Sequence, residues 1–287
     1  MTPFYQTEYG SLYNGEDLQV MKIFPDNYFK MVITSPPYNI KGIRMTDAPY
    51  KAKRDDQRRN NEYKGSISIK PYATFDDAMP HEKYVEWQRS VIRELWRLID
   101  NDGAIYYNHK ARHVAKRLWL PTDLIPPNEG IILRDLVHWD RLSGYEYCPT
   151  HYCPQEEWIM IIAKDDWKLK DRKSSKKGNR GNIWRIAPAI GNPHPAPFPI
   201  ELPLYALETT SEKSQPVLDC YGGSGTTAFA CEMSKRSWVL IEKSEAYCKD
   251  YIQLGLKRLK YGMNPIGKDV KIKGGLLDEY VSTGDLS

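Results

Sequence analysis

The chain has 287 residues, 41% hydrophobic and 27% charged, which is typical of a globular protein with a substantial core. It shows no bilayer-length apolar run, no signal-peptide pattern at its start and an odd number of cysteines, five. We therefore expect a cytoplasmic protein with reduced thiols and exclude membrane and disulfide-rich classes. The net charge of +4 is uneven, with +5 in residues 41–73, +6 in residues 164–185 and −7 in the remainder, so each basic segment is either a solvated loop or a contact for a polyanion.

Apolar periodicity and turn residues divide the chain into alternating strands and helices. In the first half they predict a helix over 16–24, a strand over Lys30–Thr34, a loop over 41–73, a helix over 80–99, a strand over Ala104–Tyr107 and a helix over 110–119. In the second half they predict strands over Ile131–Trp139, Trp158–Ala163, Pro216–Asp219 and Ser237–Glu242, a basic loop over 164–182, and helices over Ile200–Thr209, Thr226–Ser234 and Ser244–Leu259.

This alternation predicts an α/β protein with a doubly wound, mainly parallel sheet and helices on both faces. We expect one domain over residues 1–262 that carries the two basic segments as long insertions. Residues 263–287 are expected to form a peripheral tail.

Two prolines end the first predicted strand in Thr34-Ser35-Pro36-Pro37-Tyr38-Asn39. Taken alone, the segment is either a proline-rich turn or a site that handles an amine. The Ser35 hydroxyl and the rigidly aimed Pro36 carbonyl are suited to accept the two N–H groups of an exocyclic base amine, which would localise the nitrogen lone pair. Tyr38 offers an aromatic face to a base extruded from the duplex, and Asn39 either fixes the turn or contacts that base.

Cys148, His151 and Cys153 are close in sequence, but no second cysteine pair at finger spacing follows them, so we predict a thiol-containing hairpin and no metal site. The histidines His109, His113 and His138 are interpreted as packed or surface residues. Trp184, beside the second basic segment, is either a core residue or a DNA contact.

A glycine-rich turn follows the predicted strand over Pro216–Asp219 and runs from Gly222 to Gly225. Its glycines let the backbone approach a ligand closely, and the helix that follows presents free N–H groups. No lysine follows the last glycine, so the turn is not a P-loop. The next strand ends in Glu242, whose carboxylate is suited to accept hydrogen bonds from both hydroxyls of a ribose. The pair indicates either a nucleoside-containing cofactor or an ordinary strand-to-helix turn.

Three segments, in this order, resemble motifs of the β group of DNA amino-methyltransferases. Thr34–Asn39 resembles the catalytic motif (Asp/Asn/Ser)-Pro-Pro-(Tyr/Phe/Trp), His194–Pro199 resembles the His-Pro segment, and Asp219–Thr227 resembles the cofactor motif Asp-Pro-Phe-x-Gly-Ser-Gly-Thr. The chain departs from the pattern in having Cys220 and Tyr221 where Pro and Phe are usual. Only about twenty residues lie between Ala163 and Trp184, where the family places its target-recognition domain.

The resemblance implies an S-adenosylmethionine-dependent DNA methyltransferase with a seven-stranded-type sheet. In this family Ser before Pro-Pro-Tyr is associated with N4 of cytosine and Asp with N6 of adenine. That rule has exceptions, so an adenine enzyme of the same fold stays open, as do an RNA methyltransferase and a non-catalytic DNA-binding protein. The partners implied are double-stranded DNA, a second copy in a homodimer and a cognate restriction endonuclease.

The resemblance and the residue chemistry together assign roles to three sets of residues. The catalytic set is Ser35, Pro36, Pro37 and Tyr38. The cofactor set is Asp17, Thr34, His194, Phe198, Asp219, Tyr221, Gly223, Ser224, Gly225, Thr226 and Glu242. The base- and DNA-contacting set is Asn39, Lys41, Arg44, Lys173, Lys176, Lys177 and Arg180. Two of these residues have a second interpretation, since Asp17 suits a helix cap and His194 suits a proline-rich corner.

Overall fold

The computed structural model describes residues 1–39, 75, 78–114, 117–142, 151–152, 154–170, 181–189, 194 and 196–266. Several predictions lie outside these residues: the loop over 41–73, residues 171–180 of the basic segment over 164–185, Cys148, Cys153 and the end of the chain beyond 266. None of the helices within the described ranges is long and apolar enough to cross a membrane.

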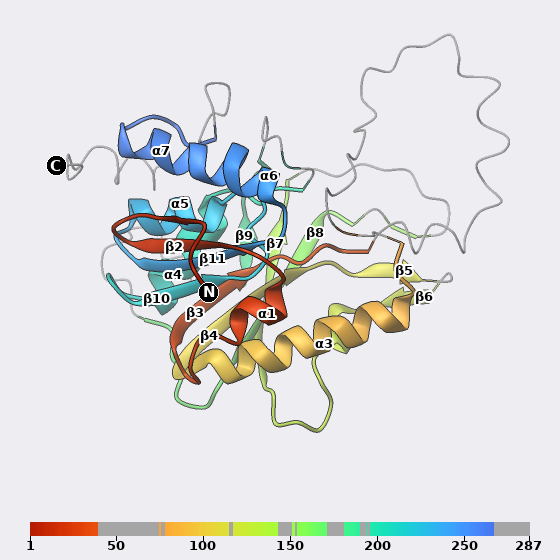
Figure 1. The fold of residues 1–287 in the computed structure, drawn as a ribbon. Coiled ribbons are helices and arrows are strands. Elements are labelled where there is room, and N and C mark those ends of the chain that lie inside the picture. The colour runs from red at the N-terminus through yellow and green to blue at the C-terminus, as the bar shows by residue number, and fades with distance from the viewer. Residues whose placement is uncertain are drawn as a thin grey trace, which may run out of the picture.

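A nine-stranded sheet forms the centre of the molecule, in the order β1-β2-β11-β10-β3-β4-β8-β7-β9 (Figure 1). The strands are β1 (Tyr5–Gln6), β2 (Gly10–Asn14), β3 (Phe29–Thr34), β4 (Ile99–His109), β7 (Leu133–Asp140), β8 (Glu156–Ala163), β9 (Ile183–Arg185), β10 (Pro216–Asp219) and β11 (Ser237–Glu242). The five strands from β2 to β4 in this order pair in parallel, whereas β8 is antiparallel to both β4 and β7. The predicted α/β class with a mainly parallel sheet is confirmed.

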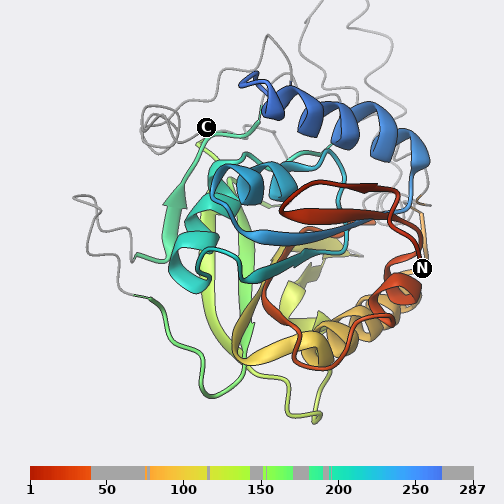
Figure 2. The ribbon, with the colours of Figure 1, turned by 60° about the vertical axis from the view of Figure 1, so that its left-hand side comes forward.

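Helices cover both faces of the sheet (Figure 2). The helical segments are α1 (Asp17–Met21), α3 (His81–Leu98), η2 (Pro121–Leu124), α4 (Glu201–Thr210), α5 (Thr226–Met233), α6 (Glu245–Tyr247), the π-helical η3 (Cys248–Gln253) and α7 (Leu254–Lys260). Because side chains alternate along a strand, β3 sends Val32 to a core shared with α3, and Met31 and Ile33 to a core shared with α4 and α5. This alternation buries all six residues of β3, as expected for a strand covered on both sides.

The predicted helix over 110–119 is wrong. Residues Arg112–Val114 (β5) and Arg117–Trp119 (β6) pair as antiparallel strands instead. The hairpin is favoured over a helix because its cross-strand pairing places the Arg112 guanidinium over the Trp119 ring, 4.3 Å from the ring centroid. Both residues are buried in this arrangement. Trp184 does not face outward either; it is buried on β9, with its ring 5.6 Å from that of Tyr205.

Candidate active site

The segments singled out in the sequence all meet at one edge of the sheet. Because β11, β10, β3 and β4 are parallel, their carboxyl ends, including Glu242, Asp219, Thr34 and His109, lie along this edge. The antiparallel strand β8 begins at the same edge, where Trp158 is the register partner of His109. The proline-rich and glycine-rich segments therefore leave the sheet from neighbouring strands, the place where open α/β sheets bind ligands.

Asp219 joins the two segments. Its carboxylate accepts hydrogen bonds from the Thr34 hydroxyl at 2.7 Å, the Thr227 hydroxyl at 2.7 Å and the Tyr221 amide at 3.0 Å. The side chain is almost completely buried, and burial raises the pKa of Asp219 to about 6. These contacts are internal, so Asp219 is placed to fix the spacing between Thr34 and the glycine-rich turn.

The glycine-rich turn needs backbone conformations that only glycine adopts easily. Gly223 and Gly225 have φ values of +53° and +87°. A Cβ on Gly223 would lie 3.1 Å from Nε2 of His194, so glycine also leaves space there. The Gly223 amide donates to Glu242 at 2.7 Å, and the Ser244 amide donates to the other oxygen of the same carboxylate at 2.7 Å. Burial raises the pKa of Glu242 to about 7.

His194 and Phe198 approach this turn from the segment before α4. Burial lowers the pKa of His194 to about 4, so its ring is neutral at physiological pH. Nδ1 of His194 accepts a hydrogen bond from the Ala196 amide at 3.2 Å, and the ring meets Tyr247 edge to face at 5.2 Å. Phe198 is partly buried and packs on the core shared with α4 and α5. His194 thus supports a proline-rich corner and also borders the turn.

Asp17 is a buried acid at the start of α1, beyond the end of β2. Its Oδ1 accepts the Leu18 amide at 2.7 Å, whereas Oδ2 makes no hydrogen bond of ordinary geometry to a described residue, although the Tyr221 side chain lies close enough to lower the pKa of this carboxyl. Burial raises the pKa of Asp17. A buried acceptor without a partner is costly, which makes this oxygen a candidate contact for a ligand's N–H groups.

The catalytic segment carries a hydrogen-bond network that the sequence analysis did not predict. The Ser35 hydroxyl lies 3.1 Å from the Tyr38 hydroxyl, which donates to Oε2 of Glu157 at 2.8 Å. Asn108 Nδ2 donates to the Tyr38 hydroxyl at 2.9 Å and to the same Glu157 oxygen at 3.1 Å. Asn108 lies near the end of β4, and Glu157 lies near the start of β8. Because the two strands are antiparallel, with Asn108 paired to Ile159, both residues come to the same edge of the sheet. Only the antiparallel pairing brings Glu157 to this edge, and no sequence signal indicated it.

The ring of Tyr38 is packed rather than open. It lies 4.5 Å from the His109 ring at an interplanar angle of 32°, and only 7% of the side chain is exposed. Its carbonyl accepts a hydrogen bond from Arg112, whose guanidinium also covers the Tyr84 ring at 5.0 Å. The Lys110 ammonium also lies over this ring, 5.9 Å from its centroid. The open aromatic face predicted for Tyr38 is therefore not found, because His109 and Lys110 cover the ring.

The remaining predicted residues divide into described and undescribed positions. Asn39 has φ +54°, is 1% exposed and donates to the Met79 carbonyl at 2.7 Å, so it fixes the end of the turn. Ser224 and Thr226 lie 3.2 Å apart through their hydroxyls in the buried start of α5. The basic residues predicted to contact DNA, which are Lys41, Arg44, Lys173, Lys176, Lys177 and Arg180, lie outside the described residues.

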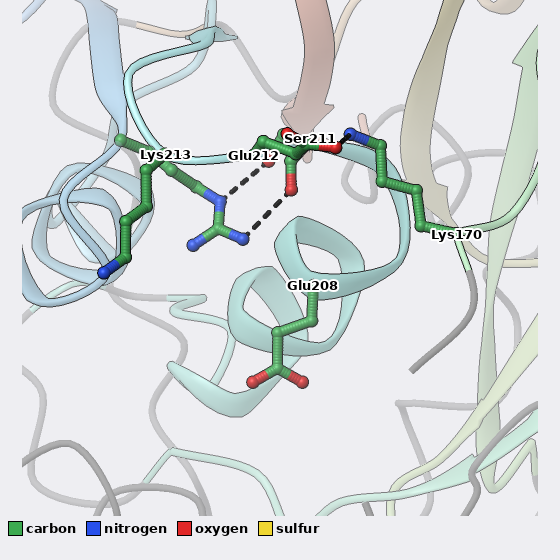
Figure 3. Close-up of a pocket in the computed structure, with 6 residues that line it drawn as sticks. Lys170, Glu208, Ser211, Glu212 and Lys213 are labelled. Carbon is green, nitrogen blue, oxygen red and sulfur yellow. Dashed lines mark hydrogen bonds and ion pairs between the residues drawn. The ribbon is translucent and has the colours of Figure 1, made fainter. Parts of the chain in front are cut away.

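A hollow lined by Lys170, Glu208, Ser211, Glu212, Lys213 and Arg236 lies away from these segments (Figure 3). It borders the residues that precede β10 and β11, which is the opposite edge of the sheet. Lys170 pairs with Glu212 at 2.7 Å, and the buried Arg236 donates to the Ser211 hydroxyl at 2.9 Å. Because the hollow lies at the edge of the sheet opposite the proline-rich and glycine-rich segments, it is not the candidate active site.

Comparison with known proteins bears on the sheet-edge arrangement. The family model described as DNA methylase matches residues 29–253, more than half of the chain. The chain is 24% identical to Type II methyltransferase M.BglII of Bacillus subtilis, over 85% of this chain and 68% of that protein. It is 24% identical to Type II methyltransferase M.PvuII of Proteus hauseri, over 85% of this chain and 83% of that protein.

Solved structures show the same fold. The PvuII DNA methyltransferase, described as cytosine-N4-specific, matches with a TM-score of 0.63 and 19% identity, over 98% of this chain and 94% of that chain. M1.HpyAVI in complex with SAM matches with a TM-score of 0.52 and 18% identity, over 87% of this chain and 99% of that chain.

Proposed function

The chain belongs to the DNA methylase family, and from this premise we propose that it transfers a methyl group from S-adenosylmethionine to the exocyclic N4 of cytosine in DNA. The observation that carries the choice of cytosine is Ser35, which stands at the position where the family pattern has Ser, Asp or Asn. The fold shared with the cytosine-N4-specific PvuII enzyme supports the same choice.

The residues at the sheet edge fit such a cofactor. When bound, S-adenosylmethionine supplies a methyl group made electrophilic by a sulfonium centre. The unpartnered Oδ2 of Asp17 would accept the N–H groups of its amino acid part, and Glu242, oriented by two backbone amides, would accept the ribose hydroxyls. Gly223 and Gly225 give the turn its positive φ values and leave it without side chains there, so its backbone can approach the cofactor closely. Structures of related fold solved with SAM support this assignment.

The catalytic segment would act on the base amine. The Ser35 hydroxyl and the Pro36 carbonyl each accept one N–H of the amine, so that its lone pair points toward the methyl group. Two consecutive prolines restrict the backbone and thereby hold the carbonyl in place. Most of the rate is then a matter of positioning two reactants, because no strong base is needed before the nitrogen attacks. Extrusion of the base from the duplex is part of the proposal, since the amine is inaccessible within a base pair.

The second candidate is N6-adenine methylation, because the matched family includes both activities. The test is to incubate the protein with duplex DNA and labelled S-adenosylmethionine and to identify the modified nucleosides by mass spectrometry. We expect N4-methylcytosine with the unaltered chain and none with Ser35→Ala. N6-methyladenine as the only product would replace cytosine by adenine. Absence of any methylated nucleoside would overturn the proposed activity.

The basic residues Lys41, Arg44, Lys173, Lys176, Lys177 and Arg180 are proposed to contact the phosphates of DNA. Duplex DNA should then bind more weakly as salt rises, because each contact releases counterions. Salt-independent binding, or stronger binding of RNA in competition, would contradict the proposal. We also propose that the enzyme acts as a homodimer beside a cognate restriction endonuclease, since its relatives are type II methyltransferases. Methylome sequencing of cells expressing the chain would identify the site that such an endonuclease recognises.

A further inference from the structure

Ser35, Tyr38 and Glu157 form a continuous chain of hydrogen bonds from the catalytic segment to the start of β8. The two links are 3.1 Å and 2.8 Å long. The phenol of Tyr38 has one hydrogen, and the Glu157 carboxylate can only accept, so that hydrogen points to Glu157. Ser35 must then donate its own hydrogen to the Tyr38 oxygen. The direction of the whole chain is therefore set by the charge at its end.

Asn108 reinforces this direction. Its amide nitrogen, which has no acceptor capacity, donates to the Tyr38 oxygen and to Oε2 of Glu157. The Tyr38 oxygen consequently accepts from both Ser35 and Asn108 while donating to Glu157. Asn108 also makes a long contact with the Ser35 oxygen, 3.4 Å from its amide nitrogen. Since the Ser35 hydrogen is committed to Tyr38, the Ser35 oxygen keeps acceptor capacity for an N–H donor, which is what a base amine supplies.

The position of Glu157 is fixed from its other side. Its Oε1 lies 3.2 Å from a guanidinium nitrogen of Arg141, which follows the end of β7. Glu157 is 7% exposed and is the register partner of Trp139 on β7. One carboxylate oxygen is thereby held for Arg141, and the other is presented to Tyr38 and Asn108. The neighbouring Glu156 contacts different groups, His138 at 2.6 Å and Trp158 at 2.9 Å, and is exposed.

We propose that Glu157 is a positioning residue for the amine methylation described above and the final acceptor of the proton that the reaction releases. This inference rests on the proposed function. As the new C–N bond forms and the sulfonium carbon–sulfur bond breaks, the amine nitrogen becomes positively charged and must lose one proton. That proton passes to the Ser35 oxygen, the Ser35 hydrogen passes to the Tyr38 oxygen, and the Tyr38 hydrogen passes to Oε2 of Glu157. Ser35 and Tyr38 end unchanged, and Glu157 ends as a neutral carboxylic acid.

A purely structural role for Glu157 makes different predictions. A buried carboxylate that only satisfies Tyr38, Asn108 and Arg141 would affect folding and the affinity for ligands, but not the rate of the chemical step once cofactor and DNA are bound. A proton acceptor acts on that step, so a shorter side chain that keeps the carboxylate should restore part of the rate.

The test compares Glu157→Gln, Tyr38→Phe and the double variant with the unaltered chain, using Glu156→Gln as the matched control. Glutamine keeps the size of the side chain and removes its charge, and phenylalanine removes only the hydroxyl that links Ser35 to Glu157. Methyl transfer is measured in a single turnover on saturating unmethylated DNA. Binding of S-adenosylmethionine is measured by calorimetry, and folding by thermal unfolding.

We expect each single variant to transfer the methyl group about 10- to 100-fold more slowly, with cofactor affinity unchanged. The double variant should be no slower than the slower single variant, because the two residues act in one chain. Glu156→Gln should transfer the methyl group at the rate of the unaltered chain. Glu157→Asp, which keeps the carboxylate, should recover part of the rate. If Glu157→Gln fails to fold, Tyr38→Phe tests the same link without removing the charge.

The proposal is overturned if Glu157→Gln and Tyr38→Phe transfer methyl groups as fast as Glu156→Gln, or if their losses multiply in the double variant. Failure of Glu157→Asp to recover any of the rate lost in Glu157→Gln would overturn it as well. A different result, no methyl transfer by the unaltered chain on any DNA, would overturn the proposed function instead, so the two failures are distinguishable.

Discussion

The Thr34 hydroxyl donates a 2.7 Å hydrogen bond to the buried Asp219 carboxylate, and this contact joins the last residue of β3 to the last residue of β10. The two strands are parallel neighbours, and each is followed by one of the two functional segments. A single buried contact thus fixes the distance between the proline-rich segment, proposed to act on the base amine, and the glycine-rich turn, proposed to bind the cofactor.

We expect Thr34→Val to weaken this coupling. The substitution keeps the shape of the side chain and removes one of three donors to a buried carboxylate, which should lower the free energy of unfolding by about 2 kcal/mol. Methyl transfer should slow as well, because the two segments lose their common anchor. Urea unfolding and single-turnover kinetics measure the two effects. The control is Thr210→Val, which removes a buried 2.7 Å contact to Tyr106 far from the site; it should lower stability but leave methyl transfer unchanged.

Ser35→Ala should separate chemistry from binding. The Ser35 hydroxyl is placed toward Tyr38 and the proposed base amine, not toward the glycine-rich turn. Turnover should therefore fall about 100-fold, while the affinity for S-adenosylmethionine measured by calorimetry stays the same. Ser90→Ala is the control, because Ser90 is a partly buried serine on α3 whose hydroxyl bonds only within its own helix, to the Glu86 carbonyl. Equal losses of turnover and cofactor affinity would contradict the role given to Ser35.

Much of the sheet could be predicted because its central strands are local features of the sequence. The strands Pro216–Asp219 and Ser237–Glu242 have the predicted bounds, and β3 begins one residue earlier than predicted. Each is a short apolar run with a turn signal at its end, so the pattern carries the information. The proline-rich and glycine-rich segments each follow one of these strands. They meet at one edge because parallel strands share their carboxyl ends.

The N-terminal hairpin of β1 and β2 was not predicted, because a distant residue determines it. Gly10 begins β2, where a glycine argues against a strand. In the structure, a Cβ on Gly10 would lie 2.3 Å from the Trp238 ring of β11, so only glycine allows the two strands to pair. No local pattern contains that contact.

The network around Glu157 was missed for a related reason. Asn108 and Glu157 are ordinary polar residues near the ends of strands, and the sequence does not state that β8 runs antiparallel to β4. Arg112 was predicted to lie in a helix for a similar reason. The residues that its guanidinium covers, Trp119 on β6 and Tyr84 on α3, come from other elements and cannot be read from the local sequence. Strand direction, rather than residue type, was the missing information.

Gly223→Ala should weaken cofactor binding more than folding. Alanine at φ +53° is strained by about 1 kcal/mol, and its Cβ would also crowd His194 at 3.1 Å. Gly130→Ala is a matched control, because Gly130 has φ +72° with nothing within 4 Å of the added carbon. Both variants should lose stability in thermal unfolding, and Gly223→Ala should lose more because of the crowding at His194. Only Gly223→Ala should bind S-adenosylmethionine about tenfold more weakly or worse by calorimetry. Equal cofactor affinities in the two variants would argue against a cofactor site at this turn.

Glu242 should make the stability of the protein depend on pH. Burial raises its pKa from the ordinary value of 4.5 to about 7, so between these values the folded chain holds a proton that the unfolded chain has released. The stability of the unaltered protein should therefore fall as pH rises through this window, and Glu242→Gln, which has no such proton, should escape that loss. Relative to the unaltered chain, the variant should gain about 2 kcal/mol in free energy of unfolding between about pH 5 and pH 8.

Urea unfolding of both proteins at the two pH values measures this gain, and Glu245→Gln, a change at an exposed position on α6, controls for the loss of one charge. Cofactor affinity should move in the opposite direction. The ribose hydroxyls are donors and favour the carboxylate form, so S-adenosylmethionine should bind the unaltered chain more tightly as pH rises through about 7, and Glu242→Gln should lack this dependence. A stability gap that stays constant with pH would show that the buried carboxylate is already ionised at pH 5. The same carboxylate would thus destabilise the free protein at neutral pH and hold the cofactor there, a cost in stability that is common at binding sites.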